Sequence, residues 1–246
     1  MDILYGASAF RYHRTPPQVL ALMPPVPQAE GDRCRFELRR HSLIRDVLSL
    51  PLHLLAIDKA DRTPALYSSR HLQSGELPFG SVLETEHGIG VSSPAMTLFQ
   101  LARSLSVTHV AMAMYEMCGS FAVFNLSKLP QELASQVDVA TPLCASAWRN
   151  ARGSDGKPSD LWNRPPLVEL AELEQLAKDM KDQRGCRVFE QALGRVTGIV
   201  ASPFEAQLSL LLATPRSAGG EGLKSFSNNA RIALSGKATR LAGRYS

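Results

Sequence analysis

Residues 198–229, GIVASPFEAQLSLLLATPRSAGGEGLKSFSNN, contain the clearest local pattern of the sequence. Ser202 is a residue type that caps the free backbone N–H groups of a helix, and Pro203 suits the first helical position because it has no N–H to lose. Glu205 stands three residues after the cap, so it can reach back to the N–H of Ser202 in a capping box. A helix is therefore predicted to begin at Ser202.

Large apolar residues recur at helical spacing after this start: Phe204, Leu208, Leu211 and Leu212. The spacing predicts a helix with one apolar face. Pro215 is expected to stop this helix, and the glycines of GGEG at 219–222 predict a turn that visits positive φ.

The same stretch resembles a known kind of domain. SPFEAQLSLLL, then GGEGL, then Asn228-Asn229 and the apolar Ile232 and Leu234, resemble the entry into a Vsr-like endonuclease-related domain. In actinobacterial proteins this domain often follows a module similar to the AbiEi-type antitoxins of type IV toxin–antitoxin systems. GIGVSSPAMTLFQLARSLSV at 88–107 and YEMCGSF at 115–121 resemble a segment of those antitoxins.

Patterns in the first half predict short strands followed by two helices. The apolar run 52–57 and the alternating residues 35–38 read as strands, and segments 81–86 and 89–91 as a hairpin. Helices are predicted over 94–105 and 107–118, each preceded by a serine that can cap it. The second contains a stripe of Val107, Val110, Met114 and Met117, which is typical of core packing and also occurs on promiscuous binding faces.

These elements predict an α+β protein with a small mixed sheet and packed helices. We expect an antitoxin-like α+β module over residues 1–130 and a linker region over 131–166, in which the Gly- and Pro-rich segment 151–166 is a loop. Residues 167–246 then form a helical segment, with helices at 167–183, 188–196 and 202–213. This segment leads into an incomplete restriction-endonuclease-like domain, the truncated Vsr-like start.

Composition narrows the functional class only moderately. The chain has 44% apolar and 20% charged residues and a net charge of +4, which permits contact with nucleic acid without requiring it. The N-terminus lacks the pattern of a signal peptide. Since no apolar run approaches the ~20 residues of a membrane span, we expect a cytoplasmic protein with no membrane partner.

Residues that carry nucleophilic or metal chemistry are scattered along the sequence. The cysteines are Cys34, Cys118, Cys144 and Cys186, and the histidines are His13, His41, His53, His71, His87 and His109. No metal-ligand spacing occurs among them, so no cofactor is expected and the cysteines are predicted to be buried thiols. Ser92, Ser93 and Ser202 are interpreted as helix caps.

Glu205 is the candidate catalytic residue. In the Vsr-like family a glutamate at this SPxE position begins the domain and can lie near a metal site, whereas the capping box explains the same residue without a metal. The resemblance implies Mg²⁺ held by an Asp and a Glu that follow the Asn-rich segment. Residues 224–246 contain neither Asp nor Glu. The chain is then either the front part of a longer nuclease or a relative that has lost the nuclease half.

Basic residues without acidic neighbours mark the C-terminal segment. They are Lys224, Arg231, Lys237, Arg240 and Arg244. Contact with nucleic-acid phosphates is one interpretation, and such binding would be weak and salt-sensitive. A solvated helix face or a disordered end is the other.

Function is predicted from the resemblance together with the lack of an assembled catalytic set. We expect a non-catalytic regulatory or interaction protein that contacts a toxin-like protein partner. No helix-turn-helix pattern precedes residue 90, so repressor activity is not expected. The alternative is the N-terminal part of a Vsr-like, metal-dependent DNA endonuclease, which would need Mg²⁺ and a complete nuclease domain downstream.

Overall fold

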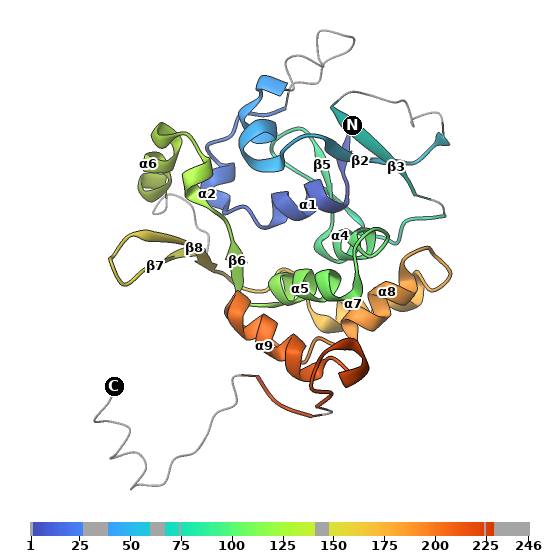
Figure 1. The fold of residues 1–246 in the computed structure, drawn as a ribbon. Helices are drawn as coiled ribbons and strands as arrows, with labels where there is room; N and C mark the ends of the chain where they lie inside the picture. Colours follow the sequence, from blue (N-terminus) through green and yellow to red (C-terminus); the bar gives the residue numbers. More distant parts are fainter. Residues whose placement is uncertain are drawn as a thin grey trace, which may run out of the picture.

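The computed structural model describes residues 2–26, 39–59, 67–73, 75–140, 148–223 and 225–228. Their course is drawn in Figure 1. The described part combines helices with two small sheets, so the predicted α+β class is confirmed.

The first sheet is small and mixed, as predicted. Its strands are β1 (Ile3–Leu4), β2 (Leu52–Ala56), β3 (Ser68–Leu72), β4 (Val82–Glu84) and β5 (Gly90–Ser92), in the order β3-β2-β1-β5-β4. β1 pairs in parallel with β5 and antiparallel with β2, while β2 and β3 are parallel. β4 and β5 form the predicted hairpin. The strand predicted at 35–38 lies outside the described residues.

Helices α4 (Pro94–Leu101) and α5 (Val107–Cys118) form where the sequence predicts them. Ser93 and Ser106 cap them by accepting hydrogen bonds from backbone N–H groups of the first turns. The stripe of α5 lies in the core, since Val110, Met114 and Met117 are fully buried. Figure 1 shows α5 below α4 and above α9, with α1 (Gly6–His13) on the side of the first sheet.

The loop predicted over 151–166 is wrong. β7 (Arg149–Arg152) and β8 (Pro158–Asn163) form a hairpin, and β8 also pairs with β6 (Phe121–Val123). The glycines belong to the hairpin turn, where Gly156 has φ +75°. Trp162 of β8 is buried and donates from its indole N–H to the carbonyl of Phe124 at 3.2 Å. The turn-forming residues between the two strands made the segment look like a loop in the sequence.

Shorter elements complete the N-terminal part and the region after β6. They are α2 (Pro17–Leu20), the π-helix η1 (Leu43–Leu48), the 3-10 helix η3 (Leu126–Lys128) and α6 (Gln131–Ala140). Because α6, β7 and β8 fall within 131–166, much of the predicted linker region has regular structure.

The three helices predicted for the C-terminal part are present. They are α7 (Leu170–Asp179), α8 (Cys186–Leu193) and α9 (Pro203–Ala213), followed by the 3-10 helix η4 (Arg216–Ala218). The restriction-endonuclease-like part predicted next would fall largely beyond Asn228, outside the described residues.

Two apolar clusters form the core. One combines α4 and α5 with residues of α7, α8 and α9, including Phe99, Met114 and Phe189. The other lies around the first sheet and reaches Trp162 of the second sheet and Trp148, which precedes β7. Because the first cluster takes residues from both sides of the predicted boundary at 131–166, that boundary does not separate two cores.

Candidate functional site

Helix α9 begins at Ser202, as the sequence predicts. The Ser202 hydroxyl accepts a hydrogen bond from the N–H of Glu205 at 3.2 Å, and Pro203 takes the first helical position. The carboxylate of Glu205 accepts from the N–H of Ala201 at 3.0 Å and from the hydroxyl of Ser202 at 3.2 Å. It therefore reaches the amide one residue before the one predicted, and its geometry is that of a helix cap.

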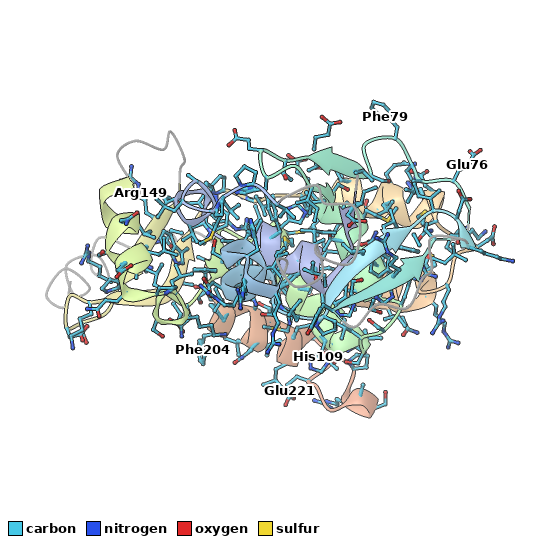
Figure 2. The ribbon with its side chains drawn as sticks, turned by 90° about the horizontal axis from the view of Figure 1, so that it is seen from above. Glu76, Phe79, His109, Arg149, Phe204 and Glu221 are labelled. Carbon is cyan, nitrogen blue, oxygen red and sulfur yellow. The ribbon has the colours of Figure 1, made fainter. Side chains whose placement is uncertain are left out.

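The apolar face predicted for α9 exists, and it points to solvent. Phe204, Leu208 and Leu211 are 74%, 46% and 49% exposed. The helix turns Ala206 and Leu210 toward the core instead. Figure 2 shows Phe204 at the outer edge of the molecule, on the opposite side from Phe79.

Two further exposed apolar residues lie in the chain before and after the helix. Ile199, before α9, is 55% exposed, and Leu223, after it, is 48% exposed. Leu223 is held beside the helix because its N–H donates to the carbonyl of Leu212 at 2.9 Å. We call Ile199, Phe204, Leu208, Leu211 and Leu223 the α9 apolar face.

The glycine turn after α9 brings the chain back onto the helix. Gly219 and Gly222 have φ of +87° and +66°, so the predicted positive-φ turn is confirmed at these positions. Gly220 is needed for a different reason: a Cβ there would lie 2.1 Å from the carbonyl oxygen of Thr214. The close approach lets the N–H of Glu221 donate to the carbonyl of Leu211 at 2.9 Å.

Asn228 fastens the described end of the chain to the side of α9. Its side-chain oxygen accepts from the hydroxyl of Ser209 at 2.9 Å, and its amide donates to the hydroxyl of Thr197 at 3.0 Å. The Thr197 hydroxyl also lies 3.0 Å from the Tyr115 hydroxyl of α5. Asn228 thus has a structural role that connects α9 to the core.

The candidate nucleic-acid residues are not placed by the structure. Lys224, Arg231, Lys237, Arg240 and Arg244 all lie outside the described residues. The described residues therefore neither bring them together nor separate them.

The described cysteines are buried. Burial raises the pKa of the Cys118 thiol to about 12 and also raises the pKa of Cys186. A protonated thiol is a poor nucleophile, so neither residue is activated for catalysis. Cys34 and Cys144 lie outside the described part of the chain.

The three serines differ in role. Ser93 and Ser202 are caps, as predicted. Ser92 is not: its hydroxyl donates to the carbonyl of Leu4 at 2.9 Å and accepts from the amide of Gln100 at 2.9 Å. Ser92 therefore joins β1 to α4.

The fold brings together two histidines that are separated in the sequence. Nδ1 of His53 on β2 lies 2.8 Å from Nε2 of His71 on β3, and the His71 ring stacks on Tyr5 at 4.5 Å between centroids. No spacing rule could reveal this pair, because the two strands meet only in the folded sheet. The contact between the two rings links β2 to β3 through their side chains. Within the described ranges no group of three or more His, Cys, Asp and Glu side chains is arranged to hold a metal ion.

A partly buried ion pair connects Arg14, at the end of α1, to α5. Two nitrogens of Arg14 donate to the two carboxylate oxygens of Glu116 at 3.0 and 2.5 Å. Glu116 also accepts from the N–H of Val123 at 3.1 Å. The Arg164 guanidinium donates to the carbonyl of Glu116 and lies 5.2 Å from the centre of the Trp148 ring. All of these contacts of Arg164 are with residues of the same chain. We therefore interpret the network as structural.

A shallow groove of about 420 Å³ lies between α7 and α8. It is lined by the apolar Leu170, Ala177 and Leu193 and by the acidic Glu174 and Glu190. The groove is open to solvent and holds no buried polar group that would orient a ligand. We therefore consider the α9 apolar face the better candidate surface.

None of the helices in the described residues is long and apolar enough to cross a membrane. Comparison with known proteins adds no family: no family model, no curated protein and no solved structure matches this chain.

Proposed function

We propose that this protein is a non-catalytic interaction protein that binds a protein partner through the α9 apolar face. The observation that carries this proposal is the outward position of Phe204, Leu208 and Leu211, three large apolar residues one helical turn apart along α9. Surface apolar residues are ordinary when single, but a contiguous group of them marks an interaction site.

The composition of α9 supports this interpretation. The helix also buries Ala206 and Leu210 on its inner side, so it is apolar on both faces. A helix of that kind is normally enclosed on all sides.

The nature of the partner comes from the resemblance to AbiEi-type antitoxins, which implies a toxin-like protein. We place the activity in the cytoplasm, because the described cysteines are unpaired thiols. Weak, salt-sensitive contact with nucleic acid by the basic C-terminal residues remains part of the proposal and is tested separately below.

The direct experiment measures, by calorimetry, binding of the purified chain to a nucleotidyltransferase-type toxin, the class of partner that the resemblance to AbiEi-type antitoxins implies. Leu208→Glu combined with Phe204→Glu should lower the affinity at least about 100-fold, because a buried charge opposite an apolar surface costs several kcal/mol. Phe79→Glu is the matched control, since Phe79 is fully exposed far from α9. Equal binding by all three proteins would refute the proposed surface.

The alternative function, the front part of a Vsr-like endonuclease, assigns Glu205 to the edge of a metal site. The carboxylate of Glu205 is instead occupied by the cap of α9. The proposal of a Mg²⁺-dependent nuclease therefore depends on residues outside those described here, and none of the described contacts favours it.

A further inference from the structure

We propose that His53 and His71 form a proton-operated latch, which holds the edge strand β3 to the first sheet near neutral pH and releases it in acid. The latch gives the protein a response to acidification. It uses none of the residues of the α9 apolar face, so it stands or falls independently of the proposed function.

Strand β3 lies at one edge of the first sheet, where β2 is its neighbouring strand. Its residues pair in parallel with Leu52–Ala56, and all of them are only half-buried. Arg103, which follows α4, holds the end of the strand by donating to the carbonyl of Leu72 at 3.4 Å and to the side-chain oxygen of Gln73 at 2.9 Å. A strand with so little buried side-chain surface opens at a lower free energy than the core does.

The contact between the two imidazoles depends on their protonation. Nδ1 of His53 and Nε2 of His71 lie 2.8 Å apart, so one nitrogen must donate a proton and the other must accept it. The bond forms when both rings are neutral or when one is charged. It cannot form when both are charged, because an imidazolium has no acceptor nitrogen and the two charges repel each other. The closed latch therefore takes up at most one proton, whereas the open latch takes up two.

The groups packed against the pair oppose a second positive charge. Burial lowers the pKa of His53, and Arg11 of α1 acts in the same direction. The ring of Tyr5, which follows β1, stacks on His71 at 4.5 Å between centroids. Burial raises the pKa of the Tyr5 hydroxyl, so this phenol stays neutral and offers no counter-charge.

The remaining charged groups near these strands do not compensate a second proton either. Arg103 and Arg184 both act on the Tyr5 hydroxyl and are themselves cations. Arg70 lies on the opposite face of β3 from His71, since successive residues of a strand alternate, and it pairs there with Asp2 at 2.8 Å.

Acid therefore favours the open latch. In the open state both histidines titrate with the ordinary pKa of ~6.5, so below that pH the open state binds more protons than the closed state. One additional proton raises the population of the open state by up to ~10-fold for each pH unit. Above this range both rings are neutral in either state, and the latch stays closed.

Hydrogen exchange measured by mass spectrometry at pH 7 and pH 5, with EDTA present to remove metal ions, tests the latch. After correction for the intrinsic exchange rate, we expect the protection of the β3 amides to fall at least about 10-fold more than that of the α4 amides. In His53→Gln, whose amide still bonds to His71 but does not titrate, this difference should disappear. His109→Gln is the matched control, since His109 is exposed on α5 and its loss should leave the wild-type behaviour unchanged.

Two results of this experiment overturn the latch. One is a wild-type β3 whose protection falls no more than that of α4. The other is an equal loss of β3 protection in the wild type and in His53→Gln, which would show that another group opens the strand.

Titration of the imidazole nitrogen resonances by NMR gives a second measurement on the wild-type chain. We expect the two rings to titrate together in two separated steps that belong to the pair, with the second proton taken up only at the lower pH. In His53→Gln, His71 should titrate in a single step. Independent single-step titration of both rings in the wild type would overturn the latch, even if β3 opens in acid because His13 is protonated.

Discussion

His13 is a largely enclosed residue whose charge the fold opposes. Its Nε2 lies 2.7 Å from the carbonyl oxygen of Ser92, and burial lowers its pKa from 6.5 to about 4, with Arg164 acting in the same direction. Between these two pKa values the unfolded chain binds the proton and the folded chain does not. The free energy of unfolding that His13 contributes is therefore complete above pH 6.5 and is lost as the pH falls through about 4.

Urea unfolding at pH 7 and pH 5 measures this contribution. We expect the wild type to lose about 2 kcal/mol more than His13→Gln over that interval, given ~1.4 kcal/mol per pKa unit. The glutamine retains an N–H donor for Ser92 but does not titrate. Parallel losses in the two proteins would show that His13 is not the residue responsible.

Glu116 is the second residue whose substitution should change the free energy of unfolding strongly. Glu116→Gln removes the charge that faces Arg14 and should lower the free energy of unfolding by about 2–3 kcal/mol, because a guanidinium then lies partly buried without its counter-ion. Lys157→Gln is the control: it breaks the exposed pair with Asp155 and should cost less than about 1 kcal/mol. Denaturant titration at constant pH compares them, and similar losses would contradict the structural role of the buried pair.

At the scale of elements, the turn after α9 depends on one glycine. Gly220→Ala places a methyl group 2.1 Å from a backbone oxygen, so the turn must move away from Leu211 and Thr214. We expect a loss of about 1–3 kcal/mol in the free energy of unfolding. Gly194→Ala is the matched control, since its Cβ would meet nothing nearer than 3.5 Å and its φ is −63°. Thermal unfolding of the two variants should show a melting temperature below that of the wild type for Gly220→Ala only.

The elements differ in how far the sequence predicts them. Those with strong local chemistry, such as α4, α5 and α9 with their Ser-Pro or Ser starts, are predicted within a few residues. β7 and β8 are not, because Gly156 and the flanking polar residues indicate a loop while the pairing with β6 is long-range. Local propensity carries no information about a strand partner that lies tens of residues away.

In the candidate site, too, the sequence predicts the features that depend on local spacing and not those that depend on long-range packing. The spacing of Phe204, Leu208 and Leu211 predicts an apolar face, but not the side on which the core lies. The core lies on the side of Ala206 and Leu210, which are buried in the cluster that also contains residues of α5. The His53–His71 pair was missed entirely, since it requires the parallel register of β2 and β3. The capping interpretation of Glu205 agrees with the structure, except that its carboxylate accepts from the N–H of Ala201 and not from that of Ser202.

At the scale of the whole molecule, the nuclease alternative has a definite test. The chain as given should not cleave plasmid DNA with Mg²⁺ or Mn²⁺, since Glu205 is held by the cap and residues 224–246 contain no carboxylate side chain. A gel-shift titration at two salt concentrations should show binding, if any, that weakens steeply with salt. Metal-dependent cleavage would show that the active site lies elsewhere in the chain.

The shared cluster of α4, α5, α7, α8 and α9 has a consequence for synthesis on the ribosome. Phe99 and Met114 are translated well before their core partner Phe189. At a translation rate of ~5–20 residues per second, several seconds pass between the synthesis of α4 and α5 and that of the helices that cover their apolar sides. During that interval the nascent chain exposes apolar surface, and we expect chaperones that bind emerging polypeptides to bind it.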